Sequence, residues 1–347
     1  MQLSPTIDAK TKILAVIGDP IEHSMSPLMH NAVIQSLGLN YIYTAFRVEP
    51  KELENAIKAV RALNIAGINI TIPHKVAAMQ FVDEIDPLAI EIGAINTIKN
   101  EKGRLMARNT DAEGSFLALQ GAGCNPEGKK CVMLGAGGVA KAIALILAGV
   151  VEDLTIINRT MDKATELKTH LDAYLSNPKN TLHPQTKKKM IKTKVQALPL
   201  SASSIISSIA NSDILINCTS VGMFPNVNES PLETFDIKLS PHLVVFDTVY
   251  NPLETKLLKH ASQSGCKTLS GADMLVNQGG SAFHWWTGVE PNRSIMSKVL
   301  KDELKKRDQQ ANQDKLSIDS KKQLTNPKKQ QTPKDGQKSN SDVGRKK

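Results

Sequence analysis

The first third of the 347-residue chain alternates between short apolar runs and longer mixed stretches. Residues 12–18 (KILAVIG) form a β-branched run ended by Gly, Asp and Pro, which predicts a buried strand. Ser26 and Pro27 begin a predicted helix over 26–37. The same reasoning predicts strands at 41–48, 65–71, 95–99 and 104–108, and helices at 50–63, 73–84, after Pro87 and at 111–122. This alternation indicates an α/β sheet with helices on its faces.

A second alternation follows from residue 130 and is typical of a doubly wound dinucleotide-binding domain. Its predicted elements are strands at 130–134, 153–158, 192–197, 213–217, 243–247 and 267–269, and helices at 138–149, 160–174, 201–210 and 253–263. A Lys-rich segment, 176–190, interrupts it and is predicted to be an exposed surface loop. Residues 273–305 are predicted to be helical. From about residue 306 apolar residues are almost absent, which predicts disorder.

Composition narrows the class of protein. The net charge is +9, but residues 306–347 hold twelve Lys and Arg against five Asp and Glu, so the excess lies mainly in this tail. The four cysteines form no C-x-x-C pair, and no histidine cluster completes a metal set, so we expect reduced thiols and no metal. The N-terminus lacks the pattern of a signal peptide, and the longest apolar stretch, 139–151, is too short to span a bilayer. We expect a cytoplasmic protein.

A glycine-rich turn between two predicted strands indicates a dinucleotide site. Gly135, Gly137 and Ala140 fit the pattern G-x-G-x-x-A, in which the glycines allow a tight turn and close approach to a pyrophosphate. Where an NAD site usually has an acidic residue, this chain has Asn158 and Arg159, with Lys163 one turn later. A guanidinium can bind a 2′-phosphate, which favours NADP; a solvated surface arginine is the alternative.

Polar side chains upstream of this turn are candidates for substrate binding and catalysis. Ser24 and Ser26 precede a helix and could bind a carboxylate, although Ser26 could be only an N-cap. Lys75, at the start of the predicted helix 73–84, opposes the helix dipole, which suggests a site; Asp111 opens another helix and could be only its cap. Reduction of a carbonyl needs a proton donor, and a lysine paired with a carboxylate can give and retake that proton. His23 and His30 lack a third metal ligand.

Nine motifs in order, from about residue 12 to 300, resemble those of the shikimate dehydrogenase family. They are G-D-P-I-E-H-S-M-S-P-L-M-H-N (18–31), N-I-T-I-P-H-K (69–75), G-A-I-N-T-I (93–98), N-T-D-A-E-G (109–114), G-A-G-G-V-A-K (135–141), N-R-T (158–160), N-C-T-S-V-G-M (217–223), D-T-V-Y-N-P (247–252) and G-A-D-M-L-V-N-Q-G (271–279). Nine motifs in order are far more specific than any one of them. The resemblance implies reversible reduction of 3-dehydroshikimate to shikimate with NADPH, a step of chorismate and aromatic amino acid synthesis.

The resemblance also implies roles for residues and domains. Lys75 would be the catalytic lysine and Asp111 its partner. Contacts to shikimate would come from Ser24, Ser26, Thr71, Lys75, Asn96, Asp111, Tyr250 and Gln278. Contacts to NADP would come from Gly135, Ala136, Gly137, Gly138, Val139, Asn158, Arg159, Thr160, Lys163, Thr248 and Gly271. Residues 1–113, completed by helices in 273–305, would bind substrate; 114–272 would form the Rossmann-like cofactor domain; 306–347 would be a disordered tail.

Three alternatives remain open at this point. A quinate/shikimate dehydrogenase relative that uses NAD would differ in pocket volume, which the sequence does not reveal. Binding of nucleic acid by the basic tail would be strongly salt-dependent, but the tail has no aromatic residues to stack on bases. A non-catalytic nucleotide sensor would not need both Lys75 and Asp111. We expect an enzyme that is a monomer or a homodimer, with neither membrane nor nucleic acid as a partner.

Overall fold

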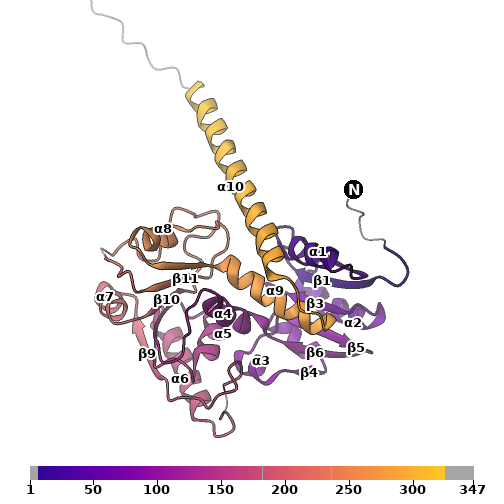
Figure 1. Cartoon of the computed structure of the whole chain (residues 1–347), viewed down its shortest axis with the longest axis horizontal. Helices are drawn as coiled ribbons and strands as arrows, with labels where there is room; N and C mark the ends of the chain where they lie inside the picture. Colours follow the sequence, from indigo (N-terminus) through magenta and orange to yellow (C-terminus); the bar gives the residue numbers. More distant parts are fainter. Residues whose placement is uncertain (1–6, 182, 236, 325–347) are drawn as a thin grey trace, which may run out of the picture. The chain divides into compact units, whose positions relative to one another are not determined.

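The computed structural model describes residues 7–181, 183–235 and 237–324. The described residues up to Lys305 cluster into one unit, and those from Lys306 onward into a second. The elements, labelled in Figure 1, are β1 (Lys12–Gly18), α1 (Ser26–Ser36), β2 (Tyr41–Arg47), η1 (Pro50–Glu52), α2 (Leu53–Ala62), β3 (Gly67–Ile70), η2 (Ala77–Phe81), β4 (Glu84–Ile85), α3 (Pro87–Ile92), β5 (Thr97–Glu101), β6 (Arg104–Arg108), α4 (Thr110–Gly121), β7 (Lys130–Leu134), α5 (Gly138–Leu147), β8 (Asp153–Asn158), α6 (Met161–Ser176), β9 (Lys194–Pro199), α7 (Ala202–Ala210), β10 (Ile214–Asn217), β11 (Val244–Asp247), α8 (Lys256–Gln263), β12 (Lys267–Ser270), α9 (Gly271–Thr287) and α10 (Arg293–Leu324).

The strands form two six-stranded sheets. The first has the order β2-β1-β3-β5-β6-β4; β1 pairs in parallel with β2 and β3, and β5 runs antiparallel to β3 and β6. The second is wholly parallel, in the order β12-β11-β10-β7-β8-β9. Its first strand in the chain, β7, lies at the centre and the order reverses there, as expected of a doubly wound dinucleotide-binding sheet. The predicted α/β class, with a Rossmann-like second half, is therefore confirmed.

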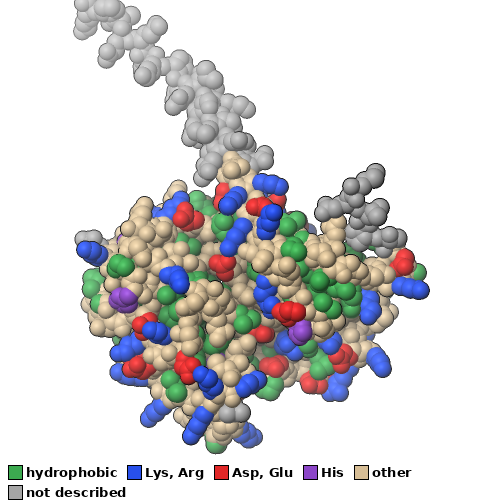
Figure 2. Space-filling model, in the orientation of Figure 1, with side chains coloured by type: hydrophobic (Ala, Val, Ile, Leu, Met, Phe, Trp, Pro, Cys, Tyr) green, Lys and Arg blue, Asp and Glu red, His purple; other side chains and the backbone are tan. Residues whose placement is uncertain are grey.

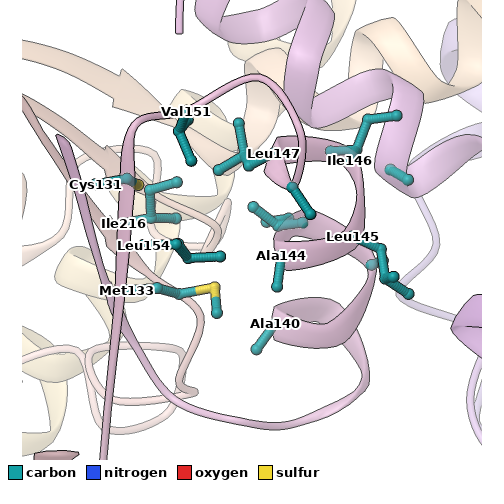
Figure 3. Packing of buried hydrophobic residues seen from close by; sticks show 14 of the residues in the cluster. Cys131, Met133, Ala140, Ala144, Leu145, Ile146, Leu147, Val151, Leu154 and Ile216 are labelled. Carbon is teal, nitrogen blue, oxygen red and sulfur yellow. The ribbon is translucent and has the colours of Figure 1, made fainter. Parts of the chain in front are cut away.

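The apolar face of α5 packs on the second sheet. Figure 3 shows side chains of α5, among them Ala140 and Ala144, turned toward Met133 of β7 and Leu154 of β8. All four are fully buried. Alanines at this contact let the helix backbone approach the strands closely, which is the role expected of the third position in G-x-G-x-x-A. The glycine-rich turn between β7 and α5 is held in place by this packing.

Helices α4 and α9 connect the two sheets, because each follows a strand of one sheet and packs toward the other. Trp286 near the end of α9 is buried against the first sheet, where its indole Nε1 donates to the carbonyl oxygen of Ile98 at 2.9 Å. Its ring lies where Gly67 leaves room, since a Cβ at Gly67 would be 2.2 Å from Nε1. The two helices touch at Gly114, where a Cβ would lie 2.7 Å from both the backbone nitrogen and Cβ of Gln278.

The helix predicted at 73–84 is not formed. Its place is taken by a turn, the short η2 helix at 77–81 and the strand β4, which the sequence did not predict. The backbone N–H of Ile95 donates to the carbonyl oxygen of Lys75 at 2.9 Å, and His74 Nε2 bonds the carbonyl oxygen of Val48 at 2.7 Å. These long-range bonds satisfy polar groups that a helix would have used internally, so Pro73 begins a turn here.

The segment 176–190 lies on the surface but has a buried anchor. His183 is 1% exposed, and its ring packs beside Phe116 of α4. Its Nδ1 accepts from the backbone N–H of Thr186 at 3.1 Å, so Nε2 carries the proton and donates to the carbonyl oxygen of Ile146 at 2.6 Å. Burial lowers the pKa of His183, which favours this neutral form. The polar composition of the loop gave no indication in the sequence that His183 would be buried.

The C-terminal part differs from the prediction over residues 306–324, where α10 continues as a helix. Low apolar content argues against a packed core, but not against a helix; residues 293–324 contain neither Pro nor Gly and many good helix formers. Residues 325–347 of the predicted tail lie outside the described residues.

Figure 2 shows Lys and Arg intermingled with Asp and Glu on the face that it draws, in keeping with the small net charge of residues 1–305. In the described part of the chain no helix has the length and apolar character to cross a membrane.

We predict that Gly114→Ala destabilises the protein, because its new methyl group would meet the backbone of α9. Overpacking of this kind costs about 1–3 kcal/mol. Gly121→Ala at the end of the same helix is the control: a Cβ there has nothing within 4 Å, and Gly-to-Ala replacement without strain stabilises by about 0.4–1 kcal/mol. Urea unfolding of both variants measures the difference. Equal stability of the two would contradict the close contact at Gly114.

Candidate active site

A pocket of about 290 Å³ lies between residues from the two sheets. All eight side chains predicted for substrate contact line it: Ser24, Ser26, Thr71, Lys75, Asn96, Asp111, Tyr250 and Gln278. Three residues predicted for cofactor contact, Val139, Thr248 and Gly271, line the same pocket. Its volume is near the lower end of the range for small-molecule sites, which run roughly 300–1,000 Å³. The predicted substrate site and part of the predicted cofactor site therefore share this cavity.

Lys75 and Asp111 form an ion pair in the lining of this pocket. Lys75 Nζ donates to Asp111 Oδ2 at 2.5 Å, and the side chains are 28% and 15% exposed, so both can reach a ligand. Asp111 does not cap its helix, because the N-cap is Asn109, whose Oδ1 accepts from the backbone N–H groups of Asp111 and Ala112. The Asp111 carboxylate is therefore not used in capping and can face the pocket.

Asn96 fixes the orientation of the carboxylate. Its Nδ2 donates to Asp111 Oδ1 at 2.9 Å, so Asp111 has one oxygen on the amide and the other on the lysine. Its Oδ1 accepts from the Thr110 backbone N–H at 2.8 Å and from Thr97 Oγ1 at 2.9 Å. Thr110 Oγ1 donates in turn to Gln278 Oε1 of α9 at 3.3 Å. These bonds join β5, α4 and α9 into one rigid wall, in which few side chains remain free to reorient.

Ser24 and Ser26 lie at the start of α1. The N-cap position belongs to Met25, which makes no side-chain cap, so Ser26 is the first helical residue and its hydroxyl is not used as a cap. Ser24 Oγ accepts from the backbone N–H of Ser26 at 3.4 Å. Two hydroxyls at the N-terminus of an eleven-residue helix suit a negatively charged group, because unsatisfied N–H groups and the helix dipole are concentrated there.

The glycine-rich turn opens at the carboxyl end of β7. Gly135 has φ +107°, a conformation that favours glycine, and a Cβ there would meet the backbone of Cys218 at 3.2 Å. At Gly137 and Gly138 a Cβ would have nothing within 4 Å, so the N-terminus of α5 faces open space. Ala136, Gly137, Gly138 and Lys163 line a second cavity of about 670 Å³ together with Lys141 and His170. An exposed helix N-terminus with nearby lysines fits the phosphates of a dinucleotide.

The end of the neighbouring strand, β8, leads into Asn158, Arg159 and Thr160. The backbone N–H of Gly135 donates to the carbonyl oxygen of Ile157 at 2.9 Å, which places the end of β8 beside the turn. Asn158 Nδ2 donates to the carbonyl oxygen of Thr160, the N-cap of α6, at 2.8 Å, and the Arg159 side chain is exposed. An exposed guanidinium at this position suits a 2′-phosphate. None of these three residues lines either cavity.

Two residues that the sequence analysis did not select contribute to the site. Asn69 lines the pocket from the end of β3, inside a motif that had been quoted only for Thr71 and Lys75. Asp247 is fully buried at the end of β11 and accepts from Thr255 Oγ1 at 2.6 Å and from Asn217 Nδ2 at 2.9 Å. Burial raises the pKa of Asp247. Its bonds hold the loop that carries Thr248 and Tyr250 into the pocket.

The two histidines considered as metal ligands are separated by their environments. His23 lines the pocket, whereas His30 is fully buried, with its ring stacked at 4.2 Å on Tyr43. Burial lowers the pKa of His30 to about 3, so it is neutral. Across residues 7–181, 183–235 and 237–324 no three His, Cys, Asp or Glu side chains are grouped to hold a metal ion.

Comparison with known proteins decides the family. Family profiles described as shikimate dehydrogenase substrate binding domain, shikimate / quinate 5-dehydrogenase and shikimate 5'-dehydrogenase C-terminal domain match residues 16–98, 117–247 and 271–301. The shikimate dehydrogenase (NADP(+)) of Methanopyrus kandleri is 40% identical over 307 residues, which are 88% of this chain and 100% of that protein. The chain belongs to the shikimate dehydrogenase family.

Solved structures agree with this membership. A crystal structure of a shikimate dehydrogenase in complex with NADP+ is 40% identical, has a TM-score of 0.75, and matches over 87% of this chain and 99% of that one. The shikimate 5-dehydrogenase from Thermus thermophilus, in complex with NADP(H) and shikimate, is 32% identical with a TM-score of 0.70, over 84% of this chain and 99% of that one. The family likeness thus extends over both sheets and the helices between them.

Proposed function

We propose that this member of the shikimate dehydrogenase family interconverts 3-dehydroshikimate and shikimate with NADP(H), in chorismate and aromatic amino acid synthesis. The observation that carries the proposal is a single pocket shared by the Lys75–Asp111 ion pair and by Val139, Thr248 and Gly271 of the dinucleotide-binding half. A proton donor and a nicotinamide can therefore act on the same carbonyl group, the donor at its oxygen and the nicotinamide at its carbon. The names of the matched relatives support the choice of substrate and cofactor.

We propose that Lys75 moves the proton in this reaction. When bound, the nicotinamide supplies or accepts the hydride. Lys75 Nζ donates its proton to the developing alkoxide during reduction and takes it back during oxidation. Asp111 holds the ammonium in position and compensates its charge, while Asn96 holds Asp111. Because these groups are hydrogen-bonded before substrate arrives, little reorganisation accompanies the reaction.

The remaining side chains would bind and orient. Ser24 and Ser26 would take the carboxylate, and Thr71, Asn96, Tyr250 and Gln278 the ring hydroxyls. Contacts to the pyrophosphate would come from Gly135, Ala136, Gly137, Gly138 and Val139. Asn158, Arg159, Thr160 and Lys163 would bind the 2′-phosphate end, and Thr248 and Gly271 the nicotinamide end. On this proposal, residues 1–113 with α9 and the first turns of α10 bind substrate, and residues 114–272 bind NADP.

The proposal also covers the cellular location and the oligomeric state of the protein. Four free cysteines, Cys124, Cys131, Cys218 and Cys266, three of them buried, suit a reducing cytoplasm. We also propose that the protein is a monomer or a homodimer without a nucleic-acid partner. Quinate is the alternative substrate, because one of the matched family profiles covers both shikimate and quinate enzymes.

The substrate and cofactor are tested by absorbance at 340 nm, with shikimate and quinate each offered with NADP and NAD. We expect turnover with shikimate and NADP to exceed the other three pairs, because Arg159 suits a 2′-phosphate and no acidic residue stands at the end of β8. Faster turnover with quinate or with NAD would favour the quinate alternative. Absence of turnover with all four pairs would contradict the proposed function.

Replacement of the lysine tests the proposed mechanism. We expect Lys75→Ala to lower kcat by about 10²–10⁴-fold, the usual contribution of general acid–base catalysis. Shikimate affinity should stay within about tenfold, because the proton donor acts mainly in the transition state. Lys163→Ala is a matched control: it removes a lysine at the proposed cofactor site, and should raise KM for NADP with a much smaller change in kcat. Near-normal kcat in Lys75→Ala would remove the assignment.

A further inference from the structure

The carboxyl ends of β10 and β11 lie side by side and carry two polar side chains that are completely buried. Asn217 ends β10 and Asp247 ends β11, and the two residues are partners in the register of this parallel pair. Asn217 Nδ2 donates to Asp247 Oδ1 at 2.9 Å. Buried polar groups are costly unless their hydrogen bonds are made, so the partners of this pair show what it holds in place.

The amide of Asn217 has only one possible orientation. The backbone N–H and the hydroxyl of Thr219 both donate to Asn217 Oδ1, at 3.0 and 2.7 Å. Because a backbone N–H can only donate, this end of the amide must be the oxygen, and the NH2 group must face Asp247. Thr219 Oγ1 in turn accepts from the backbone N–H of Val221 at 3.2 Å. Asn217 therefore fixes the first residues of the loop that follows β10.

This loop packs directly against the glycine-rich turn. A Cβ at Gly135 would lie 3.1 Å from Thr219 Cγ2 and 3.2 Å from the backbone carbonyl carbon of Cys218. The backbone N–H of Cys218 also donates to the carbonyl oxygen of Leu134, the last residue of β7, at 2.8 Å. With no room for a side chain between them, the position of Thr219 limits where the glycine turn can lie.

The other side of the buried pair holds the loop that enters the pocket. Asp247 Oδ1 accepts from the backbone N–H of Val249 at 3.1 Å, and the carbonyl oxygen of Asn217 accepts from the N–H of Thr248 at 3.0 Å. The carbonyl oxygen of Val249 accepts from the N–H of Gly271 at 3.1 Å. Thr248 and Gly271 both line the pocket. The buried pair therefore connects the glycine turn to one part of the pocket lining.

We propose that Asn217 is a positioning residue for hydride transfer: through Thr219 and Asp247 it fixes the glycine turn relative to the loop after β11, and so the place of the nicotinamide. The inference rests on the proposed function, which supplies the nicotinamide. Asn217 lines neither of the two cavities described above, so it acts only through its neighbours. The proposed 2′-phosphate contacts, Arg159 and Lys163, lie on other elements. The effect should therefore fall on hydride transfer and not on binding of the adenosine end.

Asn217→Ala tests the proposal, because it removes both ends of the amide that joins the two loops. We expect hydride transfer from shikimate, measured as NADPH formation at 340 nm in a single turnover, to slow about 10–100-fold, since misplacing reacting groups by about 1 Å has effects of this size. Calorimetry should show unchanged affinity for adenosine 2′,5′-bisphosphate, which carries the 2′-phosphate but no nicotinamide. Asn211→Ala, at an exposed asparagine shortly before β10, is the matched control and should match the wild type in both measurements.

Variants of Asp247 separate positioning from a general structural role. Asp247→Asn keeps an oxygen that can accept from Asn217 and Val249. Its NH2 group can donate to Thr255 Oγ1, so most of the hydride-transfer rate should remain. Asp247→Leu removes these polar atoms and should slow the transfer as Asn217→Ala does. Combining Asn217→Ala with Asp247→Leu should add little to either single effect, because both changes break the same connection.

Four results would overturn the proposal. They are an unchanged transfer rate in Asn217→Ala, an equal loss of rate in Asn211→Ala, a loss of bisphosphate affinity as large as the loss of rate, and effects of Asn217→Ala and Asp247→Leu that multiply in the double variant. The third result would show that Asn217 supports the whole cofactor half instead of the nicotinamide end.

Two further measurements keep the test decisive. If circular dichroism shows that Asn217→Ala does not fold, Thr219→Val replaces it, because it removes the hydroxyl bond to Asn217 and keeps the methyl group beside Gly135. A two- to tenfold slower transfer is then expected, about the value of one hydrogen bond, and an unchanged rate would overturn the proposal. Wild-type turnover of shikimate is measured alongside: its absence contradicts the proposed function, whereas normal wild-type turnover with an unchanged variant contradicts only the role of Asn217.

Discussion

The contact between α4 and α9 is the constraint on which the site depends. α4 carries Asp111 at its start, and α9 carries Gln278 in its middle; the two helices touch where Gly114 leaves no room for a side chain. The far end of α9 is tied to the first sheet by Trp286, and α4 packs into the core of the second. If these helices separated by the width of a methyl group, the pocket wall that joins Asn96, Thr110 and Gln278 would open.

Neutral hydrogen-bonded side chains do most of the positioning in this pocket, and charge is concentrated in one pair. Amides and hydroxyls of Tyr43, Asn69, Thr97 and Asn96 run through the first sheet toward Asp111, each in contact with the next. Buried neutral groups cost little when every bond is made, whereas a buried charge needs a partner. Asp111 has such a partner in Lys75, and the pair stays partly exposed, which suits proton exchange with a ligand.

The parts of the fold set by local sequence were predictable, and those set by distant contacts were not. Local sequence determines β7, the glycine turn and β8. The predicted bounds of the two strands agree with the structure. Lys75 was expected on a helix, but its carbonyl oxygen accepts from Ile95 and the neighbouring His74 bonds Val48, and both partners are remote in sequence. The helical continuation of α10 to Leu324 was missed because low apolar content was taken as evidence against any ordered element.

The candidate site shows the same division. All eight residues that the nine ordered motifs assigned to the substrate line the pocket that holds the Lys75–Asp111 pair. Asn69 was overlooked within one of those motifs, because period-two alternation does not reveal which face of a short strand meets a ligand. Asp247 and Tyr43 gave no signal, since a buried aspartate or tyrosine has its role only through partners such as Thr255 and Asn69. Residue type alone does not identify these partners.

A crystal structure of the protein with shikimate and NADP bound tests the central claim most directly. We expect the shikimate carboxylate against Ser24 and Ser26, and one ring hydroxyl within hydrogen-bond distance of both Lys75 Nζ and the Asp111 carboxylate. The carbon bearing that hydroxyl should face the nicotinamide. Shikimate bound in the opposite direction, with its carboxylate on Lys75, would contradict the account of how this pocket binds and reacts.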